Sequence, residues 1–319
     1  MNELEIIQKV QATCSSHPSV LLGIGDDAAV LKESIAKQLV CKDMLLDGVH
    51  FHVNETDPRR IGHKALAVNL SDIAAMGGVA LSAYVALALP RALCHEAFLQ
   101  GLYDGMEALA RRFDLSIAGG DTNIWDGPFA ISVTVVGSCH GRGPVLRSGA
   151  QEGDIIVVTG PLGDSYATGH HLDFTPRLKE AQRILDAVSL HSMIDLSDGL
   201  GKDLRLMCSQ SKVRASLRQD SLPIRSSLQT LPRAQALEAA LNDGEDFELC
   251  FTLAPDAWKE LQATCPDLPL TAIGHIGPGE GLAWDLGSGQ EQVILAKGYE
   301  HKADAIPSSL AKKDKSCKL

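Results

Sequence analysis

The sequence contains few aromatic residues and no long apolar run. Phe, Trp and Tyr make up 4% of the 319 residues, too few for the stacking platforms that bind single-stranded nucleic acid. No apolar stretch reaches the roughly 20 residues that cross a bilayer. The first ten residues, MNELEIIQKV, lack the basic-then-apolar order of a secretory signal. We therefore expect neither nucleic acid nor a membrane as a partner.

Clustered cysteines are also missing. Eight cysteines are spread singly, and no two form a Cys-x-x-Cys pair. Scattered cysteines are typical of reduced thiols, whereas disulfide frameworks and zinc sites use clustered ones. We therefore expect a cytoplasmic protein. Two histidine groups, in 50–52 and 170–171, offer imidazoles as ligands, but loop or surface positions are the default expectation for both.

Several motifs that bind nucleotides or activate nucleophiles are absent. There is no G-x-x-x-x-G-K-[S/T] phosphate loop, and GIGDDA (23–28) lacks the third glycine of a dinucleotide fingerprint. The Gly-x-Ser-x-Gly and His-Glu-x-x-His patterns are missing as well. These absences exclude P-loop and dinucleotide-fingerprint proteins.

Strand-like and helix-like segments alternate through both halves of the chain. The predicted strands, with alternating or short apolar patterns, are 79–89, 129–136 and 154–160, and the predicted helices are 58–76, 92–112, 176–188 and 198–209. This alternation predicts an α/β or α+β fold. The length suits two domains. The glycine-rich segment 141–153 divides them, giving expected domains at 1–142 and 143–319.

The acidic residues are concentrated in short, glycine-flanked segments. Asp and Glu number 40 against 29 Lys and Arg, a net charge of −11 that argues against nucleic acid. The segments are GIGDDAAV (23–30), KDMLLDGVHF (42–51), NLSDIAAMGG (69–78), AGGDT (118–122) and IDLSDGL (194–200). Each alone is an ordinary turn. Converging carboxylates would repel one another, and Mg²⁺ with phosphate oxygens removes that penalty. The pattern thus favours a multi-Mg²⁺ phosphate site.

Taken together and in this order, the segments resemble the thiamine-monophosphate kinases, a family of the aminoimidazole-ribonucleotide-synthetase-like superfamily. The similarity extends to AKGYEH (296–301) and includes VLRSGAQEGDIIVVTGPLGDS (145–165) and GEDFELCFT (244–252). The resemblance implies ATP-dependent phosphorylation of thiamine phosphate to thiamine diphosphate by in-line, Mg²⁺-assisted transfer. It also implies two α/β domains, a homodimer formed through the N-terminal domains, and an active site in the groove between the domains.

The resemblance also implies roles for individual residues. The implied Mg²⁺ ligands are Asp27, Asp43, Asp72, Asp121, Asp195 and Asp198. The implied ATP contacts are Gly120, Asp121, Arg147 and Ser197, and the implied thiamine-phosphate contacts are His50, Glu245 and Tyr299. Asp43, Asp121 and Arg147 are the implied catalytic residues. Mg²⁺ is the implied cofactor, ATP the co-substrate and K⁺ an additional candidate. The acceptor is already an anion, so charge neutralisation and positioning are needed rather than a general base.

The sequence departs from the family pattern at four places. Lys42 replaces a threonine before Asp43, and an ammonium there is expected to repel Mg²⁺. Asp243 replaces a glycine, the tail lacks its final aromatic residue, and the segment 166–176 is shorter than usual. Two alternatives therefore stay open: a nucleotide- or thiamine-phosphate-binding protein with weakened catalysis, and another ATP-dependent synthetase of the superfamily.

Overall fold

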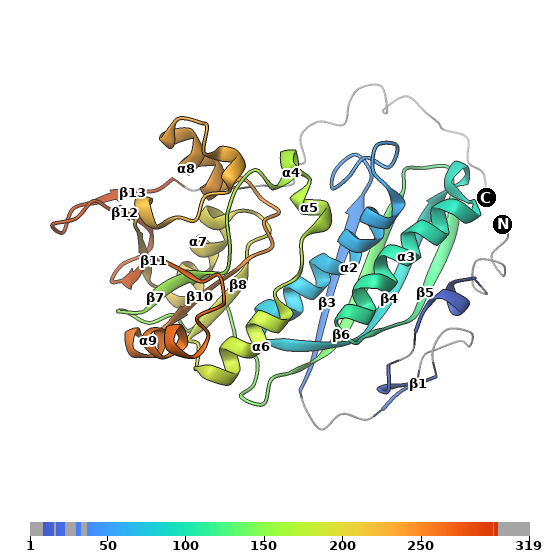
Figure 1. Ribbon diagram of the computed structural model, residues 1–319, viewed down its shortest axis with the longest axis horizontal. Helices are drawn as coiled ribbons and strands as arrows, with labels where there is room; N and C mark the ends of the chain where they lie inside the picture. The colour runs from blue at the N-terminus through green and yellow to red at the C-terminus, as the bar shows by residue number, and fades with distance from the viewer. Residues whose placement is uncertain (1–8, 16, 23–29, 33–36, 296, 299–319) are drawn as a thin grey trace, which may run out of the picture.

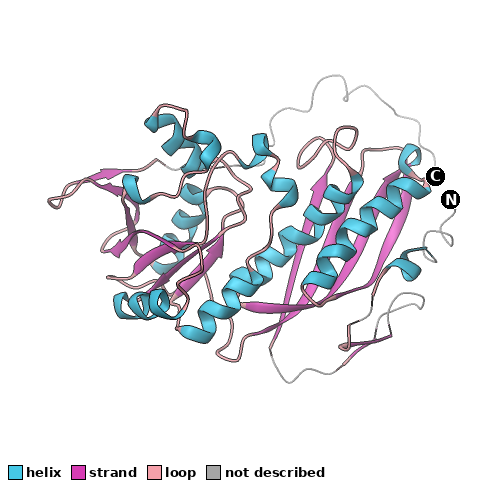
Figure 2. Ribbon diagram, in the orientation of Figure 1, coloured by secondary structure: helices cyan, strands magenta, loops and turns pink. Residues whose placement is uncertain are grey.

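The chain folds into two lobes, each built around one sheet (Figure 1). This computed structural model describes residues 9–15, 17–22, 30–32, 37–295 and 297–298. Figure 2 shows that both lobes combine strands with helices, so the predicted two-domain α/β class is confirmed. No helix in these ranges is long and apolar enough to span a bilayer.

The first lobe contains a four-stranded sheet in the order β3-β6-β4-β5, with β4 and β5 parallel and the other pairs antiparallel. Its elements are β1 (Val20–Leu22), β2 (Val30–Leu31), β3 (Gln38–Leu46), α2 (Pro58–Ala75), β4 (Gly78–Pro90), the 3₁₀ helix η1 (Arg91–Leu93), α3 (Glu96–Arg112), β5 (Ser116–Trp125) and β6 (Ala130–Cys139). Strands β1 and β2 form a separate antiparallel pair.

The second lobe contains a seven-stranded sheet in the order β13-β12-β9-β11-β7-β10-β8, antiparallel except for β12 and β9. Its strands are β7 (Ile155–Val158), β8 (Ser192–Asp195), β9 (Arg214–Leu217), β10 (Leu249–Leu253), β11 (Thr271–Gly277), β12 (Gly281–Asp285) and β13 (Glu291–Val293). Its helices are α4 (Ser165–Thr168), α5 (His170–Asp173), α6 (Leu178–Ala187), α7 (Leu200–Ser211), η2 (Gln219–Ser221), η3 (Ser226–Leu228), α8 (Arg233–Asn242) and α9 (Pro255–Thr264).

The elements predicted from periodicity are confirmed, with one shifted helix start. The helix expected at 92–112 is preceded by η1, and α3 begins only at Glu96. The His95 side chain caps it by accepting a hydrogen bond from the Phe98 amide at 3.3 Å. A capping side chain satisfies an amide that has no partner within the helix, which fixes the start at this point.

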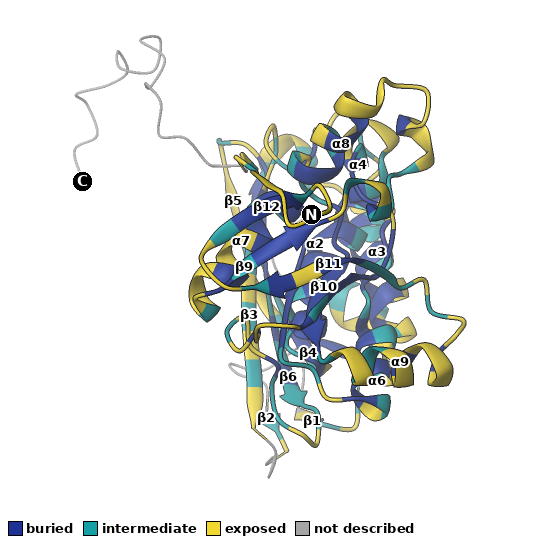
Figure 3. Cartoon of the chain, turned by 90° about the vertical axis from the view of Figure 1, so that its left-hand side faces the viewer, coloured by how far each residue is buried: buried dark blue, intermediate teal, exposed yellow. Residues whose placement is uncertain are grey.

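Helix α2 is the structural link between the lobes. Asp57 caps its N-terminus by accepting from the Arg59 amide at 2.8 Å, and Pro58 occupies the first turn. Most of the helix is buried, as Figure 3 shows by its dark blue ribbon. Gly62 permits close packing against α3, because a Cβ there would lie 1.9 Å from the Leu102 carbonyl oxygen. One continuous apolar cluster joins α2 to the second lobe through residues such as Leu185 and Phe251.

The two faces of β3 differ in their surroundings. Side chains alternate along a strand, and Cys41 and Asp43 face α2, where they contact Asn69. The intervening side chains are exposed, with Val40 at 67% and Met44 at 59%. The first sheet therefore packs against helices on one face and presents exposed apolar side chains on the other, which we call the open face.

Candidate active site

A cavity of about 510 Å³ lies between the lobes. Seven of the residues predicted from sequence line it: Asp43, His50, Asp72, Asp195, Ser197, Asp198 and Glu245. The remaining lining residues are mostly apolar: Met44, Leu45, Val49, Val68, Tyr166, Gly244 and Phe247. Three of the five acidic segments, 42–51, 69–78 and 194–200, therefore meet at one cavity, as the family resemblance implies for their aspartates.

Two chemically different groups of residues contact α2 at different points along the helix. Asp43 meets Asp72 at one end, and the Lys64 ammonium donates to the His50 carbonyl oxygen at 2.8 Å at the other. Lys64 and Asp72 are eight residues apart on one helix face, or about 12 Å at 1.5 Å per residue. We call these the acid end (Asp43, Asp72 and Asp195) and the aromatic end (Tyr166, Glu245 and Phe247).

At the acid end, two carboxylates are held close enough to share a hydrogen bond. Burial raises the pKa of Asp43, while its hydrogen bond with Asp72 opposes that shift. The pKa of Asp72 rises to about 8, chiefly through burial and then through the charges of Asp195 and Asp43. Asn69 fixes the strand here, because its Oδ1 accepts from the Asp43 amide at 3.2 Å. Burial and mutual repulsion thus favour the protonated forms of these acids, whereas a bound cation would favour the ionised forms.

Asp195 joins the acid end from the last position of β8. Its Oδ2 accepts from the buried Ser71 hydroxyl at 2.7 Å. Burial raises the Asp195 pKa, and both the Ser71 hydrogen bond and the charge of Arg147 oppose this. Arg147 lowers the pKa of Asp72 as well. The exposed Arg147 guanidinium therefore acts electrostatically on the acid end, although Arg147 does not line the cavity.

The turn after β8 carries Ser197 and Asp198 into the cavity. The Asp198 amide donates to Asp203 Oδ2 at 3.0 Å, and the Asp198 carboxylate pairs with Lys202 at 2.7 Å. The Ser197 carbonyl oxygen accepts from the Glu245 amide at 2.7 Å. Asp203 is buried, which together with the Asp195 charge raises its pKa to about 8. This turn is thus held within the second lobe by α7 and by the Glu245 loop.

At the aromatic end, the His50 ring is oriented by the backbone of its own turn. Its Nδ1 accepts from the Leu46 amide at 3.0 Å, so the neutral ring carries its proton on Nε2. Glu245 is 24% exposed, and both of its carboxylate oxygens accept from Lys64. The Tyr166 ring, which is 53% exposed, stacks on His171 at 4.5 Å between centroids. Burial lowers the pKa of His171 to about 4, so this supporting ring is neutral at pH 7.

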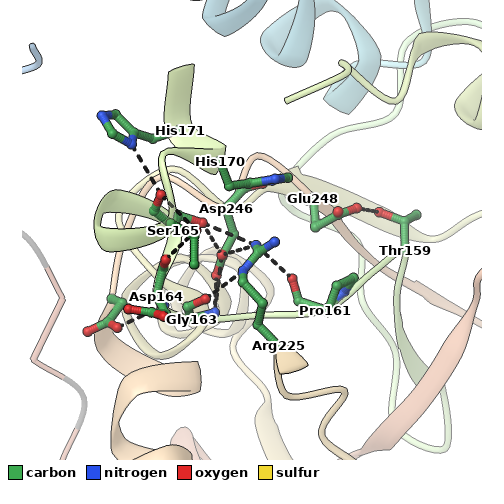
Figure 4. Close-up of polar contacts among 12 residues, drawn as sticks. Thr159, Pro161, Gly163, Asp164, Ser165, His170, His171, Arg225, Asp246 and Glu248 are labelled. Atoms are coloured by element: carbon green, nitrogen blue, oxygen red, sulfur yellow. Dashed lines mark hydrogen bonds and ion pairs between the residues drawn. The ribbon is translucent and has the colours of Figure 1, made fainter. Parts of the chain in front are cut away.

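A buried ionic network holds the loop that carries Tyr166 (Figure 4). The fully buried Asp246 carboxylate accepts from the Gly163 amide at 2.9 Å and from the Ser165 hydroxyl at 2.5 Å. Arg225 completes it by donating to Asp246 at 2.9 Å and to the Gly163 carbonyl oxygen at 2.7 Å. The shortened segment predicted at 166–176 contains only the four-residue helices α4 and α5, and this network fixes its start.

Five of the predicted residues, Arg147 among them, do not line the cavity or cannot be placed there. Asp121 is exposed on β5, pairs in register with Ala86, and accepts from the Asn123 side chain at 2.9 Å. That register places Asp121 on the open face, opposite the face that carries Asp43. Gly120 precedes it, with the Val85 carbonyl oxygen too close to admit a side chain. Asp27 and Tyr299 lie outside the described residues.

The expected repulsion between Lys42 and metal at Asp43 is not supported by the strand geometry. Lys42 is exposed and pairs in register with Thr134, whereas Asp43 faces α2. Because neighbouring side chains on a strand point to opposite faces, the Lys42 side chain lies on the open face, opposite the Asp43 side chain. Asp243, the second departure from the family pattern, accepts from the Asp164 amide at 3.0 Å.

The donor chemistry at the acid end suits Mg²⁺ bound together with phosphate. No group of three or more His, Cys, Asp or Glu side chains in the described ranges is arranged to hold a metal by itself. Mg²⁺ does not require such a cage, because it usually binds one or two carboxylates together with waters and substrate phosphates. Asp43, Asp72 and Asp195 supply oxygen ligands of the required type.

Three supporting residues were not predicted: Lys64, Asn69 and Ser71, all in α2. Each is buried, and each bonds a cavity residue or its backbone. Their signal was present in the sequence KALAVNLSD, where isolated polar side chains interrupt an otherwise apolar helix. Buried polar groups need partners, so such residues point to a polar site across the helix face.

Comparison with known proteins agrees with this architecture. The N-terminal and C-terminal domain models of the AIR synthase related proteins match residues 25–139 and 151–286. These matches cover most of the chain and establish the class of the fold and site.

More specific relatives share most of their length with this chain. A thiamine-monophosphate kinase from Rhodopirellula baltica is 38% identical over 295 residues, which cover 89% of this chain and 92% of that protein. The crystal structure of thiamine-monophosphate kinase from Stenotrophomonas maltophilia superposes with a TM-score of 0.78 at 38% identity, covering 89% and 97% of the two chains. AaThiL complexed with AMPPCP and TMP gives a TM-score of 0.73 at 28% identity, covering 94% and 96%. The chain therefore belongs to the thiamine-monophosphate kinase family.

Proposed function

We propose that the cavity between the lobes transfers the γ-phosphoryl group of ATP directly to thiamine phosphate. A phosphate oxygen of the acceptor forms the new P–O bond, the bond between the γ-phosphorus and its bridging oxygen breaks, and thiamine diphosphate and ADP are the products. The observation that carries this proposal is that carboxylates (Asp43, Asp72 and Asp195) and aromatic side chains (Tyr166 and Phe247) line the same cavity. The relative complexed with AMPPCP, an ATP analogue, and TMP supports the pairing of ligands.

The acid end is the proposed location of the reacting phosphates. Asp43, Asp72 and Asp195 would hold Mg²⁺, with Asp198 at the border of the cavity. Mg²⁺ bound there supplies charge neutralisation for the anions that must approach one another. Arg147 adds a permanent positive charge beside the same acids, and a guanidinium can donate two parallel hydrogen bonds to a phosphate. We keep Asp27 and Asp121 as proposed ligands, Gly120, Asp121 and Ser197 as proposed ATP contacts, and K⁺ as an additional candidate. Asp121 lies on the open face of the sheet, so its proposed role is separate from the carboxylates that line this cavity.

The aromatic end is the proposed location of the thiamine ring system. Its apolar and aromatic lining suits heteroaromatic rings, and the Glu245 carboxylate suits their positive charge. His50, which lines the same cavity, is a proposed contact to thiamine phosphate. No side chain has to remove a proton from the acceptor, because a phosphate oxygen is already nucleophilic. We keep Tyr299 as a proposed cover of the rings.

We also propose a homodimer formed through the open face. Exposed apolar side chains such as Val40, Met44 and Trp125 support an interface there. We place the domain boundary between 142 and 143, supported by the two sheets, which share no strand.

A cytoplasmic location is supported by the seven free cysteines among the described residues.

The direct test is an assay for thiamine diphosphate with ATP, thiamine phosphate and excess Mg²⁺. Formation of ADP and thiamine diphosphate in equal amounts is the expected result. Binding of both ligands without turnover would contradict the proposal and favour the binding-protein alternative. A product other than a diphosphate would favour the synthetase alternative.

A further inference from the structure

Lys64 is a buried charge that the proposed reaction does not use directly. Its side chain is 0% exposed, at the middle of the α2 face that borders the cavity. The ammonium donates to Glu245 Oε1 at 2.8 Å, to Glu245 Oε2 at 2.7 Å and to the His50 carbonyl oxygen at 2.8 Å. A lysine ammonium has three N–H donors and no acceptor. All three are therefore used within the protein, and none is left for a ligand.

The three bonds of Lys64 reach two segments that converge at the aromatic end. The His50 turn belongs to the first lobe, and its amide also donates to the Leu46 carbonyl oxygen at 3.0 Å. The Glu245 loop belongs to the second lobe and has a left-handed backbone, with φ at +64°. Its neighbour Gly244 passes so close to Ser197 that a Cβ there would lie 2.8 Å from the carbonyl oxygen. Lys64 is thus the contact through which the carboxylate of one lobe is held against the histidine turn of the other.

Burial disfavours the charged form of both Lys64 and Glu245. It lowers the pKa of Lys64 and raises that of Glu245, and the attraction between the two charges opposes both shifts. Apolar residues of similar volume often stabilise a fold as much as a buried ion pair does. A contribution to stability therefore does not by itself explain why this pair is present. The bonding pattern instead fixes the direction of a carboxylate that faces the cavity.

We propose that Lys64 is the positioning residue of the acceptor subsite, holding Glu245 and the His50 turn in one arrangement without touching the substrate. This inference rests on the proposed function, in which the thiamine ring system lies at the aromatic end. It follows that two parts of α2 act on different ligands. Loss of Lys64 impairs binding of thiamine phosphate, whereas the nucleotide and Mg²⁺ contacts two turns away at Asp72 are retained.

The experiment is a double-mutant cycle with steady-state kinetics for both substrates. Lys64→Met is expected to raise the KM for thiamine phosphate at least about tenfold while leaving the KM for ATP within about twofold. Glu245→Gln is expected to do the same. If Lys64 acts through Glu245, the double variant loses clearly less than the product of the two single losses, because coupled residues are not additive. Losses that multiply, or equal rises in both KM values, overturn the proposal.

Two comparisons separate positioning from general damage. Arg60→Met removes another ion pair between the lobes on the same helix, that of Arg60 with Asp173 at 2.6 Å, and is expected to leave the thiamine-phosphate KM within twofold. If Lys64→Met fails to fold, the double variant Lys64→Met, Glu245→Gln is compared with Glu245→Gln alone. The double variant has no Glu245 carboxylate that would be left buried without a partner. A further tenfold rise in acceptor KM there overturns the coupling. Wild-type protein that makes no thiamine diphosphate refutes the proposed function itself, which is a separate outcome.

Discussion

The Ser71 hydroxyl donates to Asp195 Oδ2 across 2.7 Å, joining α2 of the first lobe to the end of β8 in the second. Both side chains are buried. The bond connects the lobes at the acid end and directs one carboxylate oxygen, leaving the other for a different partner.

Ser71→Ala tests this connection. The substitution leaves a buried carboxylate oxygen without its donor, which costs about 1–3 kcal/mol. We expect a lower melting temperature without Mg²⁺ and a higher Mg²⁺ concentration for half-maximal activity, because the Ser71 bond favours the ionised form of Asp195. Ser71→Thr retains the hydroxyl and serves as the control. Unchanged Mg²⁺ dependence in Ser71→Ala would show that Asp195 does not bind the cation.

Asp43→Asn tests the assignment of the acid end. Removing one charged ligand is expected to lower kcat/KM by about 100-fold or more, since even residues that only support a metal ligand cost about 10–100-fold. Asp57→Asn is the matched control. Asp57 caps α2, and asparagine caps a helix about equally well, so activity should stay within twofold. Similar losses in the two variants would refute the assignment.

The metal-free protein should lose stability as pH rises from about 4 to about 8. Asp72 and Asp203 both have a pKa of about 8 in the folded chain, against about 3.9 when unfolded. Across that range the unfolded chain binds fewer protons than the folded chain, so the free energy of unfolding falls with pH. Thermal melting at pH 5, 6, 7 and 8 measures this effect.

Mg²⁺ should raise the melting temperature more at pH 8 than at pH 6. Binding requires the carboxylates to release their protons, which is easier at the higher pH. Asp72→Asn should be more stable than wild type at pH 8 without metal, because it removes a buried group that resists ionisation. The same variant should respond less to Mg²⁺. A wild-type response to Mg²⁺ that does not change with pH would contradict this account.

Tyr166→Ala tests the aromatic end independently of Lys64. Stacking of a heteroaromatic ring on an aromatic side chain is worth about 1–3 kcal/mol, so we expect the KM for thiamine phosphate to rise by about tenfold. Tyr166→Phe keeps the ring and should stay within twofold, as should the ATP KM of both variants. Equal effects of the Ala and Phe substitutions would assign the role to the hydroxyl instead.

Val40→Glu tests the open face as a dimer interface. A charge at this exposed apolar position should prevent burial of the face, giving a monomer by light scattering after size-exclusion chromatography. Glu260→Lys changes charge on the exposed surface of α9, away from the first sheet, and should leave the mass unchanged. A wild-type chain that is already monomeric would refute the dimer.

The sequence predicted the convergence of the acids better than it predicted their orientation. Asp43, Asp72 and Asp195 follow motifs whose order identifies the family, and all three line one cavity. The same motifs do not indicate that Lys42 and Asp121 lie on the other face of the sheet from Asp43, because a motif gives spacing along the chain but not the face. Strand register supplies that information, and it depends on pairing between β3, β6, β4 and β5.

The supporting side chains were harder to predict than the lining ones. Lys64 and Ser71 act on Glu245 and Asp195, which lie more than a hundred positions further along the chain. Local periodicity carries no information on such pairs. The late start of α3 has a local reason instead, since the His95 cap competes with continuation of the helix from residue 92.

The alternation of β3 has a consequence for how this strand can change over evolutionary time. Odd-numbered positions such as Cys41 and Asp43 face the helix and the cavity, whereas even-numbered positions such as Val40 and Lys42 face outward. On the proposed assignments, substitutions at the outward positions alter the proposed dimer interface and leave unchanged the face that carries the proposed metal ligand Asp43. The replacement of threonine by Lys42 falls at such an outward position. A change at this position is therefore on the opposite side of the strand from the Asp43 side chain.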